Sequence, residues 1–134
     1  KPACVTLSDF DGDGFTDIAY ICRDINEAQV PFGNNNGTFE GVIRYAVGAS
    51  PRSITAIDLD VNDRMDLATC NYTDNSVTVL MNNAQGQFTS TVQSSAAPGP
   101  VWITSTDLDH DSDEDVVTIG KTIPVATILM NTWF

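Results

Sequence analysis

The chain has 134 residues, of which 18 are acidic and six are basic, and its formal net charge at pH 7 is −12. Nucleic acids and anionic membranes are bound by clustered Lys and Arg, so this charge excludes both as expected partners. No run of about 18 apolar residues would span a bilayer. The start of the chain shows no signal sequence, as expected of a mature secreted chain or of a cytosolic one.

Short alternating segments rich in Val, Ile and Thr predict an all-β protein. The segments 3–8 and 18–23 predict a hairpin around the acidic stretch DFDGDGFTD at 9–17. Two further strands are expected at 28–33 and 38–46, separated by the turn sequence Asn-Asn-Asn-Gly. Together these segments predict a four-stranded antiparallel meander.

The same pattern recurs with a period of 49 residues and without insertions. The stretch at 9–17 is followed by DLDVNDRMD at 58–66 and by DLDHDSDED at 107–115. The sequence therefore predicts three tandem four-stranded blade-like repeats, the last of which stops where its fourth strand should begin. Their expected bounds are 1–50, 51–99 and 100–134, with strands at 52–57, 67–72, 76–81 and 87–93 in the second repeat and 101–106, 116–120 and 125–130 in the third.

Of the 18 acidic residues, 11 stand at positions 1, 3, 5 and 9 of these stretches, and every side chain at these positions carries oxygen. A solvated acidic turn would explain one such stretch, but threefold recurrence favours a hard cation that removes the repulsion. Calcium takes about six to eight oxygen ligands, magnesium demands a tighter octahedron and zinc prefers nitrogen or sulfur. We expect up to three calcium ions, with a backbone carbonyl at position 7. The predicted ligands are Asp9, Asp11, Asp13, Phe15 and Asp17; Asp58, Asp60, Asn62, Arg64 and Asp66; and Asp107, Asp109, Asp111, Asp113 and Asp115.

The residue at the sharp turn of each stretch differs among the three. Gly14 can take a left-handed backbone freely, Asp63 at some cost, and Ser112 is the least suited. The first loop is therefore expected to be the best formed. His110, the only histidine, stands between ligand positions and is expected to be solvated.

A hairpin centred on residue 13 would place Cys4 opposite Cys22, which predicts a disulfide and an oxidising compartment. Two reduced thiols that merely fit the strands are the alternative. Cys70 aligns with apolar positions of the other repeats and is expected to be a buried free thiol, with an intermolecular bridge as the minority alternative.

Two sequons, Asn36-Gly37-Thr38 and Asn71-Tyr72-Thr73, would accept N-glycans in a eukaryotic secretory pathway. Sequons also arise by chance, so glycosylation of Asn36 and of Asn71 is a separate prediction for each. With the predicted disulfide, they favour a secreted, extracellular protein.

The unit DFDGDGFTDIAY…VPFGNNNGTF…YAVGASP resembles the FG-GAP/VCBS repeat, a calcium-binding blade of integrin α-subunit propellers, secreted bacterial proteins and some fungal lectins. The resemblance implies β-propeller-like blades whose D-x-[DN]-x-[DN]-x-x-x-D loops, between the first two strands, hold calcium. The naming dipeptide is kept as Phe32-Gly33 and replaced by Met81-Asn82 and Met130-Asn131. Such propellers usually close with about seven blades, so the chain is expected to be a piece of a longer protein, one of several assembling copies, or an open array.

The leading functional hypothesis is a non-catalytic extracellular calcium-binding scaffold for adhesion or assembly, which associates with copies of itself as a filament or surface layer or with neighbouring repeats. The terminal Trp133-Phe134 pair would be sticky in a free monomer. A lectin or protein-ligand module with Trp102, Tyr72 or Tyr45 as stacking platforms is the second hypothesis. A glycosidase is the least favoured, because the carboxylates recur threefold and a single histidine builds no catalytic set, so no catalytic residue is expected.

Overall fold

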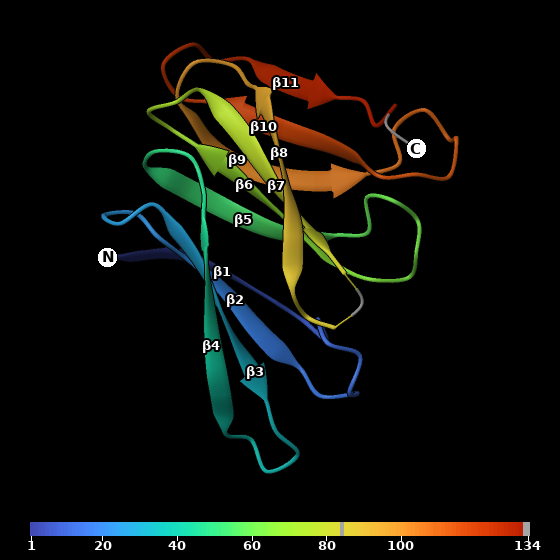
Figure 1. Ribbon diagram of the computed structural model, residues 1–134. Coiled ribbons are helices and arrows are strands. Elements are labelled where there is room, and N and C mark those ends of the chain that lie inside the picture. The colour runs from blue at the N-terminus through green and yellow to red at the C-terminus, as the bar shows by residue number, and fades with distance from the viewer. Residues whose placement is uncertain (84, 133–134) are drawn as a thin grey trace.

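Figure 1 shows a computed structural model of the chain, which describes residues 1–83 and 85–132. The regular structure in these residues is entirely β, and no helix among them is long and apolar enough to cross a bilayer. The prediction of an all-β protein is confirmed. The strands are β1 (Pro2–Ser8), β2 (Asp17–Cys22), β3 (Glu27–Gly33), β4 (Phe39–Ala46), β5 (Pro51–Ile57), β6 (Asp66–Asn71), β7 (Ser76–Asn82), β8 (Phe88–Ser95), β9 (Pro100–Thr106), β10 (Asp115–Gly120) and β11 (Ala126–Leu129).

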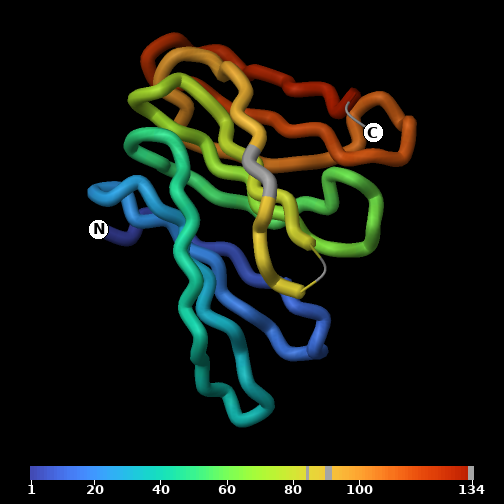
Figure 2. The backbone as a smooth tube through the Cα atoms, in the orientation of Figure 1, coloured from blue at the N-terminus to red at the C-terminus, as the bar shows by residue number. Residues whose placement is uncertain are grey.

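The strands form three antiparallel meanders, β1-β2-β3-β4, β5-β6-β7-β8 and β9-β10-β11, as the repeats predict. In Figure 2 the chain completes one sheet before it enters the next, and the three sheets follow one another in chain order. The first strand of each sheet lies against the first strand of the next, β1 with β5 and β5 with β9. The three acidic loops, each between the first two strands of its sheet, project from the same side, on the right in Figure 1.

The hydrophobic core lies between the sheets, in two clusters. The first joins Phe10, Ala19, Ile21, Ala28 and Val30 of repeat 1 to Ile54, Leu67, Leu80 and Phe88 of repeat 2. The second joins Ile57, Leu59, Ala68, Cys70, Val77 and Val79 of repeat 2 to Ile103 and Val116 of repeat 3. Each repeat thus buries its apolar face only against a neighbour, as stacked repeat units do.

The hairpin register differs from the predicted one by a single residue. Cys4 pairs with Ile21, and Cys22 pairs with Pro2 across an irregularity in the ladder. The hairpin closes on the pair Ser8 and Asp17, because Asp17 is the first residue of β2 rather than part of the loop. The predicted Cys4–Cys22 disulfide is wrong, and all three cysteines are free. The prediction that Cys70 is a buried free thiol is confirmed.

The two sequons lie in opposite environments. Asn36 is exposed, and its side-chain oxygen accepts hydrogen bonds from the backbone and hydroxyl of Thr38. Asn71 is fully buried, and its amide donates to Ser76 at 3.0 Å and to Thr78 at 2.8 Å. A glycan on Asn71 would have no room in this fold, so the prediction for Asn71 is contradicted. The predicted sticky Trp133-Phe134 pair lies outside the described residues.

Candidate metal centre

Two left-handed residues shape each acidic loop. The residues predicted to need this conformation have it, with φ of 88° at Gly14, 63° at Asp63 and 82° at Ser112. A second left-handed residue stands two positions earlier in each loop, and the sequence reasoning missed it. These residues are Gly12 at 78°, Val61 at 55° and His110 at 65°.

The first aspartate of each loop folds the loop over its own side chain. The carboxylate of Asp9 accepts hydrogen bonds from the backbone N–H groups of Gly12, at 2.7 Å, and Gly14, at 2.8 Å. Asp58 accepts from the backbones of Asn62 and Asp63, and Asp107 from those of His110 and Ser112. Because backbone N–H groups of the same loop hold this carboxylate, each loop positions its first predicted ligand by itself.

The last aspartate of each loop is buried and bridges the loop to the end of the third strand. Asp17 accepts hydrogen bonds at 2.7 Å from both Phe10, in the loop, and Gly33, at the end of β3. Asp66 binds the backbones of Leu59 and Asn82 in the same way. Asp115 does so with Leu108 and Asn131. The third-strand partner lies 16 residues beyond each aspartate, and no local sequence pattern predicted it.

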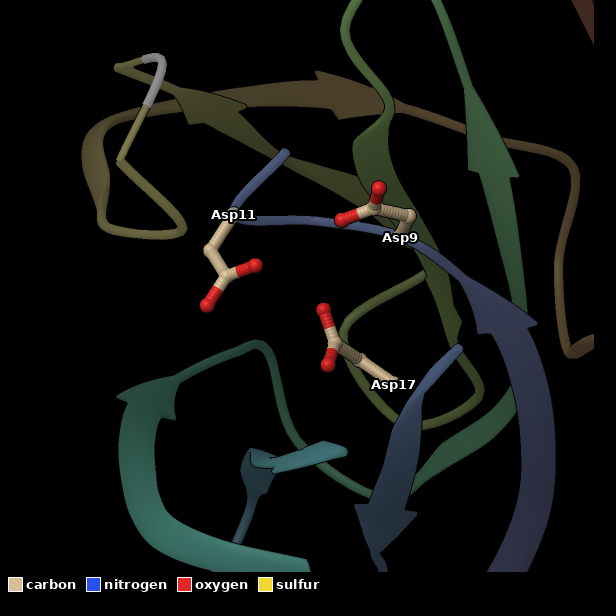
Figure 3. Close-up of side chains that lie close together, drawn as sticks. All are labelled: Asp9, Asp11 and Asp17. Atoms are coloured by element: carbon tan, nitrogen blue, oxygen red, sulfur yellow. The ribbon is translucent and has the colours of Figure 1, made fainter. Parts of the chain in front are cut away.

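Carboxylate oxygens converge in two of the loops. In Figure 3, Asp9, Asp11 and Asp17 point toward a common space, and their ligand oxygens lie within 4.8 Å of one another. Asp107, Asp109 and Asp111 form an equivalent group in the third loop. Oxygens bound to one calcium ion at about 2.3–2.6 Å can be up to about 5 Å apart. Both groups therefore have the spacing that a single calcium ion needs.

The other predicted ligands are placed differently. Asp13 lies outside the convergent group of the first loop, and its side chain accepts a hydrogen bond from Phe15 N at 2.8 Å. Asp115 likewise lies outside the group in the third loop, and within the described residues Asp58, Asp60 and Asp66 of the second loop form no such group. The side chain of Asn62 and the carbonyls of Phe15, Arg64 and Asp113 remain predictions, as does the ranking of the first loop as best formed.

The acidic loops hold oxygens that lack compensation from the protein. Asp60 Oδ1 and Asp113 Oδ1 are buried and accept no hydrogen bond from the described part of the chain. Burial raises the pKa of Asp11, with further increases from the neighbouring charges of Asp17, Asp13 and Asp9. Burial also raises the pKa of Asp66, to about 6. Buried, unpaired carboxylate oxygens are costly, so an all-oxygen donor set of this kind fits a hard divalent cation such as calcium.

The following repeat covers the acidic loop of the repeat before it. Asn82 Nδ2, at the end of β7, donates to Phe10 O in the first loop at 2.7 Å and to Met65 O at 3.1 Å. Asn131 Nδ2 donates to Leu59 O in the second loop at 2.6 Å. We call these contacts the Asn clasp. Gly86 of repeat 2 also packs on the first loop, where an added Cβ would lie 2.8 Å from Asp11 Cβ.

The predicted aromatic platforms have varied surroundings. Tyr45 packs edge-on against Phe88, with ring centroids 5.1 Å apart, and Arg52 lies 4.6 Å above the Tyr72 ring. Tyr45 and Tyr72 are therefore packing residues, whereas Trp102 is 57% exposed. A polar hollow of about 440 Å³ lies elsewhere, lined without any aromatic side chain by Asp74, Asn75, Ser76, Gln93, Ser94 and Ser95.

Fold and site together define a tandem blade-repeat protein with an acidic loop at the same hairpin of every repeat. A family model described as the FG-GAP-like repeat matches residues 9–69 and 62–118. The chain belongs to this family, which confirms the resemblance seen in the sequence. Each match begins in one acidic loop and ends in the second strand of the following repeat. FG-GAP repeats are generally non-enzymatic units. No curated protein matches the chain.

Proposed function

We propose that the chain is a non-catalytic, calcium-stabilised scaffold that acts outside the cell in adhesion or assembly, in part by association with copies of itself. The observation that carries this proposal is the convergence of Asp9, Asp11 and Asp17, which recurs in the third loop as Asp107, Asp109 and Asp111. The same acidic spacing recurs in three successive hairpins, which favours a structural role in every repeat over a single catalytic site.

Calcium would neutralise side chains that the loop backbone already positions. In the first loop Asp9, Asp11 and Asp17 would hold the ion, and Asp9 and Asp17 are fixed by backbone hydrogen bonds. Three ions with two charges each would change the formal net charge from −12 to −6. Because the ion removes repulsion within the folded loop, its binding free energy adds to the free energy of unfolding.

Calorimetric titration of calcium into chelator-treated protein tests the proposal. We expect saturable binding of up to three ions and a melting temperature that rises with calcium. A free concentration about 100-fold above Kd contributes about 2.7 kcal/mol for each site, so the increase should reach at least about 5 °C. The double variant Asp9→Asn/Asp11→Asn should lose one ion. Glu40→Gln, on the exposed surface of β4, is the matched control and should lose none.

The absence of both binding heat and a melting shift in the wild-type chain would contradict the proposal. The loss of an ion in Glu40→Gln as well would show that net charge, rather than the first loop, governs binding. Magnesium serves as the competing ion, because a site of flexible carboxylates should select calcium over the smaller, more strongly hydrated cation.

A carbohydrate-binding module is the second candidate, favoured by the polar hollow at β7 and β8. Its amide, hydroxyl and carboxylate groups suit sugar hydroxyls, and a second hollow of about 340 Å³ adjoins it through Asp74 and Gln93. A glycan array with the calcium-loaded chain tests this candidate. Binding that Gln93→Ala abolishes would support it, and an array without any hit would contradict it.

A further inference from the structure

The two cores between repeats use equivalent positions. We call the forward face of a repeat the surface that packs on the following repeat, and the backward face the surface that packs on the preceding one. The forward face comprises Phe10, Ala19, Ile21, Ala28 and Val30 in repeat 1 and Leu59, Ala68, Cys70, Val77 and Val79 in repeat 2. The backward face comprises Ile54, Leu67, Leu80 and Phe88 in repeat 2 and Ile103, Val116 and Leu129 in repeat 3.

The backward face of repeat 1 carries apolar residues at the equivalent positions, of which Val5 and Phe39 are exposed and Ile18 and Pro31 are half-buried. Val5 is 57% exposed and Phe39 is 47% exposed, whereas their equivalents in repeat 2, Ile54 and Phe88, are 4% and 7% exposed. Leu7, beside Val5 on the same face of β1, is 60% exposed. Solvent therefore contacts an apolar sheet face whose counterpart in repeat 2 forms a core.

The forward face of repeat 3 is exposed in the same way. Leu108 is 41%, Ile119 48% and Ile128 52% exposed. The residues equivalent to them in repeat 2, Leu59, Cys70 and Val79, are at most 1% exposed. The described part of the chain thus presents two unpartnered apolar faces, one on the first sheet and one on the last. Figure 1 shows these two sheets at opposite ends of the stack.

We propose that these two faces bind each other between copies of this chain, so that the forward face of repeat 3 packs on the backward face of repeat 1 of a second copy. The inference deepens the proposed scaffold function and rests on it. Its main support is continuity with the two internal interfaces, which already join forward to backward faces through equivalent positions. Because the two faces differ, the contact is heterologous and propagates from copy to copy as an open or closed array.

The contact between copies should be weaker than the internal interfaces. Inside the chain, Asn82 and Asn131 donate to the carbonyls of Phe10 and Leu59. At a contact between copies the equivalent acceptor is Leu108 O, but repeat 1 offers Gly33 in place of the asparagine. A glycine supplies no side-chain donor. Assembly should therefore depend on protein concentration.

Calcium should promote the contact. Each copy carries a formal charge of −12, which three calcium ions would lower to −6, and repulsion between like-charged copies opposes association. The third loop also lies beside the proposed contact, because Leu108 belongs both to this loop and to the forward face.

Analytical ultracentrifugation in calcium, over a 100-fold range of protein concentration, tests the inference. The wild type should form species larger than a monomer. Val5→Asp, on the backward face, and Ile128→Asp, on the forward face, should each weaken association at least tenfold. Ile25→Asp is the control, since Ile25 is 53% exposed in a turn and repeat 2 carries Asp74 at the equivalent position.

A mixture gives the sharpest result. Val5→Asp retains the forward face of repeat 3 and Ile128→Asp retains the backward face of repeat 1, so an equimolar mixture should form one-to-one dimers and nothing longer. Val5→Thr and Ile128→Thr, which keep strand propensity, replace the aspartate pair if either of those variants lacks the β-sheet circular dichroism of the wild type.

A wild-type chain that binds calcium by calorimetry and yet sediments as a monomer throughout overturns the inference and leaves calcium binding intact. A chain that neither binds calcium nor associates overturns the proposed function as well. If Ile25→Asp weakens association as much as the face variants do, the contact lies elsewhere and the inference is overturned. The same holds if the equimolar mixture stays monomeric.

Discussion

Val61 holds a left-handed backbone, φ 55°, at the position where the first loop has Gly12. A β-branched residue pays about 1–2 kcal/mol for this conformation, which glycine adopts freely. We expect Val61→Gly to raise the free energy of unfolding by about 1 kcal/mol, because part of the relief is offset by the extra freedom of glycine in the unfolded chain. Guanidinium denaturation in calcium measures the change.

The reciprocal substitution is the control for Val61. Gly12→Val should lower the free energy of unfolding by about the same amount, since Gly12 has φ 78° and a Cβ there would meet only an ordinary contact, with Arg64 Nη1 at 3.5 Å. A destabilised Val61→Gly protein would show that the valine side chain contributes packing that outweighs the strain.

The raised pKa of Asp66 predicts that stability depends on pH in opposite directions with and without calcium. Burial raises its pKa to about 6 from the ordinary 3.8, against the opposing hydrogen bonds from Asn82 and Leu59. In calcium-free protein the folded state therefore binds more protons than the unfolded state between about pH 4 and pH 6, and the free energy of unfolding falls as the pH rises through this window. The calcium ion proposed for this loop would bind the ionised carboxylate, so protons would compete with the ion.

Scanning calorimetry at pH 7 and pH 5 measures this dependence. We expect the melting temperature of calcium-free protein to rise on acidification and that of calcium-loaded protein to fall. The raised pKa of Asp11 acts in the same direction as that of Asp66. If the calcium-free protein is instead destabilised between pH 7 and pH 5, other groups dominate its proton linkage.

At the scale of the strands and loops, the Asn clasp is the feature that joins one repeat to the next. We expect Asn82→Ala to lower the free energy of unfolding by about 2–3 kcal/mol, because it removes two hydrogen bonds and leaves the buried Phe10 carbonyl without its donor. Urea denaturation measures the loss. Asn36→Ala is the control, since Asn36 is exposed and its side chain bonds Thr38 in the same turn.

A loss below about 0.5 kcal/mol for Asn82→Ala, close to that of the Asn36 control, would mean that water replaces the clasp without penalty. Asn131→Ala offers an independent repetition at the next interface, where its side chain donates to Leu59 O.

Local patterns predicted the strands and the acidic loops, whereas contacts between distant residues escaped them. Alternation and turn residues gave each strand to within two residues, and Asp9, Asp11 and Asp17 followed from spacing alone. The register was wrong by one residue because Asp17 belongs to β2, where Gly33 N–H, 16 residues away, holds it. No local pattern encodes such a partner.

The Asn clasp shows the same limit. Asn82 and Asn131 stand where repeat 1 has Gly33, so the sequence suggested only a lost motif dipeptide. The structure gives the substitution a function, since the Asn82 side chain reaches a carbonyl 72 residues earlier in the chain. The two asparagines are 49 residues apart, so the repeat period itself marked them as equivalent. Their acceptors can be identified only from the stacking of the sheets.

At the scale of the whole molecule, packing between repeats and the proposed calcium binding use the same loops. The first loop provides both the convergent carboxylates and the carbonyl of Phe10 that Asn82 binds. The second loop is clasped by Asn131 in the same way. If calcium binding and the Asn clasp stabilise the same loop conformation, each must strengthen the other, and the coupling free energy is the same in both directions. Calcium should therefore stiffen the stack as well as each loop.

This coupling predicts a site-specific effect on calcium affinity. Asn82→Ala should weaken calcium binding in the first loop about fivefold or more, the lower range of such couplings. It should leave the third loop unchanged, because within the described residues the hydrogen bonds of Asn82 are to the first two repeats. A calcium titration followed by NMR distinguishes binding in the two loops. The amide signals of Gly12 and Gly14 report on the first loop, and those of His110 and Ser112 report on the third. Asn131→Ala should spare the first loop. Equal weakening of both loops by Asn82→Ala would mean that the variant loosens the whole fold, and an unchanged first loop would mean that clasp and ion act independently.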